Sequence, residues 1–425
     1  MTWEHPTTSD GSPVVDLQGL GFDEGAHLLV GRALARVPPG GEIAVLGYRP
    51  DLTTGLAAWC RREGCEVRLP GPSDARDGRP SNAQGGRPGG VARARAWVRP
   101  GRRVTDRWSG AERAGGAAPD GVAARPPAHW GLAARGALVE AGGPETAFDF
   151  ADRDVVWSEL APSLYAHAAA AQWDPATAIP WDSPFTLPDA VEQAVVQIMT
   201  YLVENEQAAL IIPARLLARV HPHFREVLQL LAVQAADEAR HVEVFTRRAL
   251  LKNGRMGTSS VGGRASLTTL LAEPDYSLAS FLLSVLGEGS FLNLLAFLER
   301  HAPDPVTRRV VQLARQDEAR HVAFGIAHLQ HQATVDPGLR HRLRAAVERR
   351  HDALADTAGL NQDVTDALIV MAAGEWTPRA IARGHREVLR LQAQMDEGRR
   401  RRLVHLGFPH REAADLSALH TRNFM

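Results

Sequence analysis

The sequence predicts a mainly α-helical protein, in which a four-helix bundle with accessory helices follows a small α/β domain. Three observations support this prediction. The phrase Asp-Glu-Ala-Arg-His-Val occurs twice, at residues 237–242 and 317–322. The chain after about residue 150 carries apolar residues at helical spacing over long stretches. The first 70 residues instead alternate short apolar runs with helical patterns, as α/β units do.

Composition limits the classes of function. A chain of 425 residues is long enough for two or more domains. The net charge of -1 gives no reason to expect a nucleic-acid partner. There are two cysteines without a CxxC pattern, no N-terminal signal pattern, and no apolar run long enough to span a bilayer. We therefore expect a cytoplasmic protein without a disulfide framework and without a membrane partner.

Residues 1–70 are predicted to form the small α/β domain. Strands are expected at 14–17, 42–47 and 66–69, and helices at 23–37 and 52–63, the second helix ending at Gly64 as a C-cap. The phrases at 16–20, 37–41 and 59–66 resemble the TusA-like sulfur-carrier family. That family has a reactive Cys-Pro after the Gly-Leu, where this chain has Phe22 and Asp23. A docking or regulatory domain is therefore favoured over sulfur transfer.

Residues 71–135 are rich in Gly, Arg, Pro and Ala and show little apolar periodicity. This composition predicts a flexible linker, because it cannot bury enough apolar surface to offset the entropy of ordering. The arginines could also be read as a nucleic-acid-binding tail, but aromatic residues are few among them. Residues 136–425 are then the helical domain.

Each repeated phrase contains Glu-x-x-His, as Glu238 with His241 and Glu318 with His321. Residues three apart share one helix face, so each pair can bind a metal ion from one side. Two such helices and one Glu from each of two others make the ligand set of a carboxylate-bridged di-iron or di-manganese bundle. The alternative is that both pairs lie on solvated helix faces.

The two missing carboxylates are expected on the helices that precede the two motifs. Glu206 falls on the apolar stripe of a helix at 188–220, which Pro213 should kink or interrupt. Glu204 lies about 200° away on that helix, so we choose Glu206. Glu288 falls on the apolar stripe of a helix at 277–301. The separations of 32 residues to Glu238 and 30 to Glu318 suggest a duplicated helix pair.

Asp237 and Asp317 precede the motif glutamates and are predicted to support the site. Metal-binding histidines usually donate their other N–H to a carboxylate or carbonyl. By pseudo-symmetry we expect Asp317 to bind His241 and Asp237 to bind His321. The alternative is simple pairing with Arg240 and Arg320. Four further histidines are off the ligand stripe and are expected at the surface or as caps: His221, His223, His328 and His331.

Three more helices are expected at 338–358, 362–373 and 377–405. They are amphipathic and rich in arginine, and they could wrap the bundle or make the face of a homodimer. The arginines at 399–402 are expected to form a solvated helix end, which the helix dipole favours.

With these ligands in place, residues 155–335 resemble the ferritin-like dimetal superfamily, and within it the branch of ribonucleotide reductase small subunits and ligand-binding oxidases. The resemblance is carried by the phrases at 318–325 and 287–289 and by Trp173-x-Pro175-x-x-x-Ile179. It implies two iron ions, with a mixed Mn/Fe pair as the alternative, and O2 as co-substrate. It also implies an oxygenase or oxidase acting on a small organic or acyl substrate.

The departures from the relatives leave the substrate open. Phe245 stands where reductase subunits carry a radical-bearing Tyr, Ala314 where arylamine oxygenases add a third His, and Leu283 with Ala209 where the oxidases form a Tyr–Val crosslink. Hydroxylation, desaturation, N- or S-oxygenation, and a metal-binding or docking protein without turnover all stay open. An external electron donor is expected. The sequence does not reveal which one, because no Gly-x-Gly-x-x-Gly of a flavin or nicotinamide site follows a strand.

Overall fold

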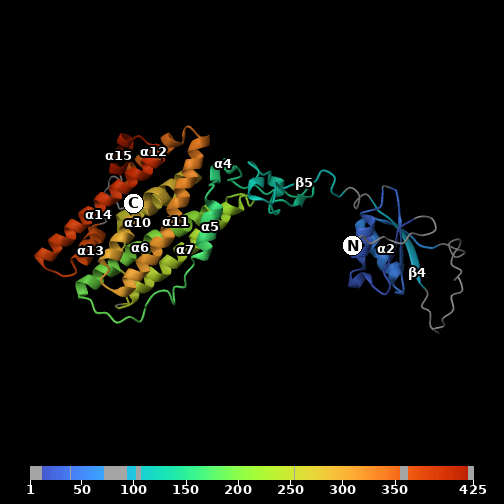
Figure 1. Cartoon of the computed structure of the whole chain (residues 1–425), viewed down its shortest axis with the longest axis horizontal. Coiled ribbons are helices and arrows are strands. Elements are labelled where there is room, and N and C mark those ends of the chain that lie inside the picture. Colours follow the sequence, from blue (N-terminus) through green and yellow to red (C-terminus); the bar gives the residue numbers. More distant parts are fainter. Residues whose placement is uncertain are drawn as a thin grey trace. The chain divides into compact units, whose positions relative to one another are not determined.

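The computed structural model describes residues 12–38, 40–70, 93–101, 107–252, 254–354 and 362–419. These residues divide into two compact units (Figure 1). The smaller unit comprises Met1–Arg113 with Leu138–Gly143, and the larger one Ala114–Ala137 with Pro144–Met425.

The smaller unit is a mixed sheet with helices on one face. Its strands are β1 (Val14–Asp16), β2 (Ile43–Gly47), β3 (Glu66–Arg68) and β4 (Ala94–Arg99), in the order β1-β2-β4-β3. Helices α1 (Ala26–Leu34) and α2 (Leu52–Glu63) follow β1 and β2, and α2 ends at Gly64 with a φ of 71°. Cys60 is a buried residue of α2, and burial raises the pKa of its thiol to about 12, so it is a poor nucleophile.

Strand β4 lies inside the stretch that we expected to be a linker. It pairs antiparallel with both β2 and β3, and so closes the middle of the sheet. Ala96 and Val98 point into the core, whereas Trp97 lies on the opposite face between the guanidinium groups of Arg68 and Arg95, at 3.9 and 4.6 Å. The surrounding arginines concealed this alternation in the sequence. The predicted linker residues 71–92 and 102–106 lie outside the described residues.

Residues 114–137 also depart from the linker prediction, because they belong to the helical unit. They include the short helices η3 (Pro119–Gly121) and η4 (Ala128–Trp130) and are flanked by the two-stranded sheet of β5 (Glu112–Arg113) and β6 (Leu138–Val139). Arg135 forms a buried ion pair with Glu226 at 2.5 Å, and the N–H of Ala123 donates to Nε2 of His223 at 2.8 Å. Such polar anchors leave no apolar period in the sequence.

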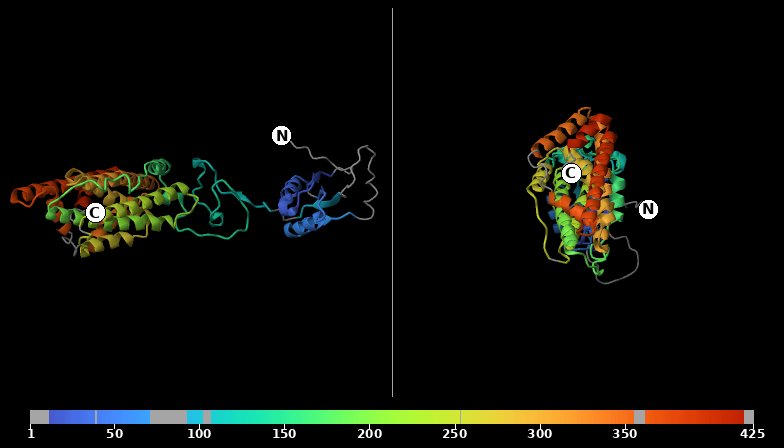
Figure 2. Two further views of the ribbon diagram at one scale, coloured as in Figure 1. Left: turned by 90° about the horizontal axis from the view of Figure 1, so that it is seen from below. Right: turned by 90° about the vertical axis from the view of Figure 1, so that its left-hand side faces the viewer.

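The larger unit is a helical bundle with an outer layer of accessory helices. Its long helices α6 (Asp189–Leu217), α7 (Arg225–Leu250), α10 (Gly289–His301) and α11 (Pro305–Val335) run side by side (Figures 1 and 2). The remaining helices are α4 (Arg153–Val156), α5 (Ala161–Ala170), α8 (Val261–Leu271), α9 (Tyr276–Ser280), α12 (Leu339–Leu354), α13 (Gln362–Ala373), α14 (Pro378–His405) and α15 (His410–Leu419). Helix α8 and helix α15 were not predicted.

The local sequence explains several helix boundaries. Asp304 caps α11 by accepting the N–H of Thr307 at 2.7 Å, with Pro305 in the first turn. Thr377 caps α14 in the same way before Pro378. Helix α6 contains Pro213 and still continues to Leu217, so the expected interruption does not occur. Pro213 lies in the last turns of α6, where few backbone hydrogen bonds remain to be lost.

The third bundle helix contains a π-helical segment. Helix α9, the π-helix η5 (Phe281–Glu288) and α10 follow each other without a gap, and the widened turns end at Glu288. This stretch, Tyr276–His301, is the one described helix long and apolar enough to cross a membrane by composition. In the structure 83% of that apolar window is buried inside the protein, as in the central helix of a bundle.

The accessory helices cover the bundle. Helix α13 packs on α6, and α14 packs on α10 and α13. Arg399 of α14 is 1% exposed, and Nε of Arg402 donates to the carbonyl of Val285 at 2.7 Å. The prediction that residues 399–402 form a solvated helix end is therefore wrong for these two arginines.

Candidate metal centre

Four helices bring the six predicted ligands to one place in the bundle. Glu206 comes from α6, Glu238 and His241 from α7, Glu288 from the end of η5, and Glu318 and His321 from α11. All six side chains are buried, and the most exposed, Glu288, is 5% exposed. Glu204 is half-buried and outside the cluster, as its helical phase predicts.

The six residues form two overlapping ligand sets. One contains Glu206, Glu238, His241 and Glu318, and the other Glu238, Glu288, Glu318 and His321. Within each set the potential ligand atoms lie within 4.8 Å of one another. Glu238 and Glu318 belong to both sets, which is the position of carboxylates that bridge two metal ions.

The donor atoms fit a pair of cations. Each of the four glutamates has one buried carboxylate oxygen without a hydrogen-bond partner. Nδ1 of His321 is likewise buried and without a hydrogen-bond partner. That Nδ1 lies 2.9 Å from Oε1 of Glu238 without hydrogen-bond geometry. Nδ1 of His241 lies 3.1 Å from Glu238 Oε2 and 3.5 Å from Glu206 Oε2. Unpaired buried acceptors are costly, so their convergence indicates a positive charge among them.

The electrostatics of the cluster point the same way. Burial, and then the charges of neighbouring carboxylates, raise the pKa values of Glu206 and Glu288 well above the usual range. Burial alone would lower the pKa values of His241 and His321, but the surrounding carboxylates outweigh it and raise both. Without a metal the centre therefore holds extra protons, which bound cations would replace.

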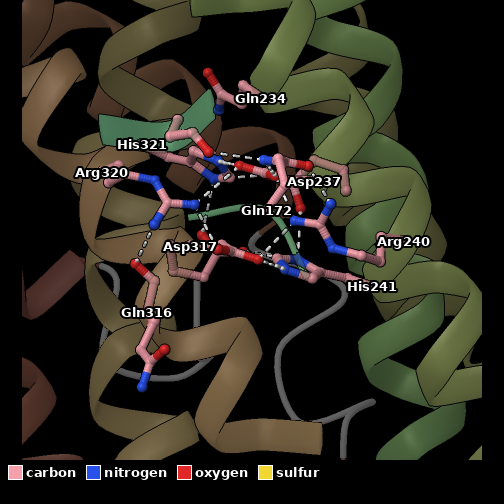
Figure 3. Close-up of polar contacts among 12 residues, drawn as sticks. Gln172, Gln234, Asp237, Arg240, His241, Gln316, Asp317, Arg320 and His321 are labelled. Carbon is pink, nitrogen blue, oxygen red and sulfur yellow. Dashed lines mark hydrogen bonds and ion pairs between the residues drawn. The ribbon is translucent and has the colours of Figure 1, made fainter. Parts of the chain in front are cut away.

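A ring of four charged residues surrounds the two histidines (Figure 3). Nε2 of His241 lies 3.2 Å from Asp317, and Nε2 of His321 lies 3.3 Å from Asp237, so each motif supplies the aspartate for the other. Both aspartates also pair with Arg240 and Arg320. The histidine contacts are those expected from pseudo-symmetry, and the pairing with arginine occurs together with them. Nδ1 of both histidines is left facing the glutamates.

Sequence reasoning missed several residues that hold this arrangement. The indole N–H of Trp173 donates to Asp317 at 2.8 Å, and the amide of Gln172 donates to Asp237 at 2.9 Å. The amide of Gln234 donates to Oε1 of Glu288 at 3.0 Å. Gln234 is one helical turn before Glu238, so its place on the ligand face was visible in the sequence. Trp173 and Gln172 precede α6 in a segment without a helical pattern.

Three of the histidines that we expected at the surface or as caps are buried, and none of them caps a helix. His328 lies between the carbonyl of Trp157 and the hydroxyl of Ser277, at 3.0 and 3.1 Å. His221 and His223 are 1% and 2% exposed, at the start of α7. None of them reaches the ligand sets. Their polar partners lie in loops and turns, which a helical-phase argument does not place.

A small cavity of about 20 Å³ adjoins the ligand sets. Its polar wall residues are Asn205 and the ligands Glu206, Glu288 and Glu318. The other wall residues carry no polar side-chain atom: Ala208, Ala209, Leu267, Leu270, Leu283, Gly287 and Phe291. This volume is enough for one water-sized group and not for an organic molecule. Leu267 and Leu270 come from α8, outside the bundle, and Asn205 presents a buried oxygen without a partner.

No model of a known protein family matches the chain, and no curated protein sequence does. The resemblance of residues 1–70 to sulfur carriers is therefore unsupported. The helical part is similar in fold to solved structures of R2-like ligand-binding oxidase. One with an aerobically reconstituted Mn/Fe cofactor is 18% identical, covering 57% of this chain and 94% of its own, with a TM-score of 0.43. A photoconverted form is 19% identical over 57% and 94%, with a TM-score of 0.41.

Proposed function

We propose that this protein is an O2-dependent dimetal oxidoreductase. The observation that carries the proposal is the pair of buried ligand sets that share Glu238 and Glu318. Four carboxylates and two imidazoles suit iron or manganese, so the pair would be Fe/Fe or Mn/Fe. When bound, such a pair supplies the binding and reduction of O2, which the protein side chains cannot perform.

The residues of the chain would then divide the remaining work. Asp317 and Asp237 keep the Nε2 proton on His241 and His321, so that Nδ1 of each ring is free to bind metal. Gln234 holds one oxygen of Glu288 and leaves the other toward the cluster.

The cavity sets what can reach the centre. Most of its wall residues are apolar, which favours a site with little water around the ligands. A molecule about the size of water fits the volume, whereas an organic substrate would need the walls to move apart. The substrate would be a small organic or acyl molecule, and its electrons would come from an external donor.

The test is metal content followed by O2 consumption. Protein loaded with Fe(II), or with Mn(II) and Fe(II), should bind two metal ions per chain and consume O2 in the presence of a reductant. Glu206→Gln should lose metal, while Glu204→Gln, two residues away and outside the ligand sets, should bind as the wild type does. One metal ion or none per wild-type chain would contradict the dimetal assignment. Two metal ions without any O2 consumption would leave a metal-binding protein without turnover.

A further inference from the structure

Helix α14 packs on the third bundle helix from outside the bundle, at the widened turns of η5 that lead to the ligand Glu288. Nε of Arg402 donates to the carbonyl of Val285 at 2.7 Å. The hydroxyl of Ser290 donates to the carbonyl of Leu286 at 2.7 Å, and Nη1 of Arg399 donates to that hydroxyl at 3.3 Å. Two consecutive carbonyls just before Glu288 thus accept side-chain hydrogen bonds, and α14 supplies or supports both.

Gly289 makes this approach possible. A Cβ atom at this position would lie 2.4 Å from Nε of Arg402 and 2.5 Å from its Cζ. Any side chain there would push the guanidinium off the helix. The residue after the ligand Glu288 is therefore small for the sake of a contact with α14, and not because its backbone needs a positive φ.

Arg402 has no carboxylate partner among the ion pairs of the described residues. Burial lowers the pKa of its guanidinium to about 10, which measures the cost of removing this cation from water. Its neighbours Arg400 and Arg401 are exposed and pair with Asp396 and Glu397 on their own helix. A half-buried arginine that donates to a backbone carbonyl and forms no ion pair points to a positional role.

We propose that Arg402 is a positioning residue, which holds the π-helical turn of η5 in the register that directs Glu288 into the metal centre. A π-helical turn carries one extra residue and is rare in proteins. It occurs frequently at functional sites, where the extra residue changes the direction in which a side chain points. Glu288 belongs to one of the two ligand sets and not to the other. Loss of the hydrogen bond from Arg402 to Val285 should therefore weaken metal binding at the ligand set that contains Glu288 and leave binding at the other set unchanged. This inference rests on the proposed dimetal site.

The experiment compares Arg402→Met with Arg401→Met, its exposed neighbour. Arg402→Met keeps the length of the side chain and removes the donor. After loading with iron, it should bind about one metal ion per chain, against two in the wild type and in Arg401→Met. Its Mössbauer spectrum should match that of Glu288→Gln and differ from that of Glu206→Gln. Arg402→Lys keeps a donor and should recover part of the second metal.

Gly289→Ala provides a second route to the same result, because its methyl group displaces the guanidinium while Arg402 itself is kept. It decides the matter if Arg402→Met does not fold, as judged by circular dichroism. Two metal ions and a wild-type spectrum in folded Arg402→Met or Gly289→Ala would overturn the inference. Equal losses in Arg402→Met and Arg401→Met would overturn it as well. Fewer than two metal ions in the wild type would instead contradict the proposed function.

Discussion

Glu206 lowers the stability of the metal-free folded protein and at the same time supplies a ligand for metal binding. It is 1% exposed and faces Glu238 and Glu318 from an otherwise apolar stripe of α6. An ionised carboxylate in that place destabilises the folded chain unless a cation or a proton neutralises it. The residue is thus unfavourable for folding alone and favourable for metal binding.

This conflict gives a prediction for the metal-free protein. At pH 7, Glu206→Gln should be more stable than the metal-free wild type by roughly 1–3 kcal/mol, because Glu206 must take up a proton to enter this cluster of acids on folding, whereas the amide is already neutral. Urea unfolding in the presence of a chelator measures the difference. Glu204→Gln is the matched control and should change the free energy of unfolding by less than about 0.5 kcal/mol. A less stable Glu206→Gln protein would show that the carboxylate is not under electrostatic strain.

Residue patterns predicted the inner part of the centre and little of what surrounds it. Helical phase alone placed Glu206 and Glu288, and the repeated motif placed the other four ligands and the two aspartates. Trp173, Gln172 and Arg402 could not be found in that way. Each contacts the site from an element whose position depends on tertiary packing, and a period within one helix says nothing of its partners.

At the scale of elements, His328 joins α11 to two earlier parts of the chain. Its Nδ1 lies 3.0 Å from the carbonyl of Trp157 and its Nε2 lies 3.1 Å from the hydroxyl of Ser277 in α9. Burial, with a contribution from His331, lowers the pKa of His328 to about 4, although Asp275 acts in the opposite direction. The imidazole is therefore neutral in the folded protein at pH 6.

The stability of the helical unit should consequently fall as the pH drops. The unfolded chain takes up a proton near the ordinary histidine pKa of about 6.5, and the folded chain only near 4. Between these values the unfolded state binds more protons, so His328 costs up to about 3 kcal/mol of stability by pH 4. Urea unfolding at several pH values gives the free energy of unfolding as a function of pH. That free energy should fall less steeply with decreasing pH in His328→Gln than in the wild type. An unchanged dependence of stability on pH in His328→Gln would exclude this cause.

The π-helix is the element that the sequence concealed most fully. The run at 281–288 has the apolar stripe of an ordinary helix, and Glu288 falls on that stripe under either description. Other helices pack closely against the widened turn, as Gly325 of α11 does. A Cβ on Gly325 would lie 2.6 Å from Cβ of Ser284. Strand β4 was missed for a related reason, since its pairing with β2 and β3 outweighs its arginine-rich composition.

At the scale of the whole molecule, bound metal ions should be a main source of stability for the helical unit. Its ligands come from four helices, and bound ions that leave the unfolded chain untouched stabilise the fold by mass action. At a free metal concentration of a thousand times Kd, this stabilisation is about 4 kcal/mol for each site.

Removal of the metal ions should therefore lower the Tm of the helical transition by several degrees. Scanning calorimetry at pH 7, before and after chelation, measures the shift, and adding Fe(II) or Mn(II) back should restore it. None of the six ligands comes from the smaller α/β unit, so a separate transition from that unit should not move. An identical Tm with and without metal would mean that the ions do not bind the folded helical unit in preference to the unfolded chain.

The ring of two aspartates and two arginines has a consequence for the redox properties of the centre. Its formal charges sum to zero, and the two histidines are neutral as ligands, so the four glutamates alone determine the charge offered to the metals. Four negative charges match two divalent ions. Each electron removed from such a pair leaves an uncompensated positive charge in a dry interior, where isolated charge is costly. If two metal ions bind as proposed, electron transfer at the centre would therefore be coupled to the release of a proton or the uptake of an anion.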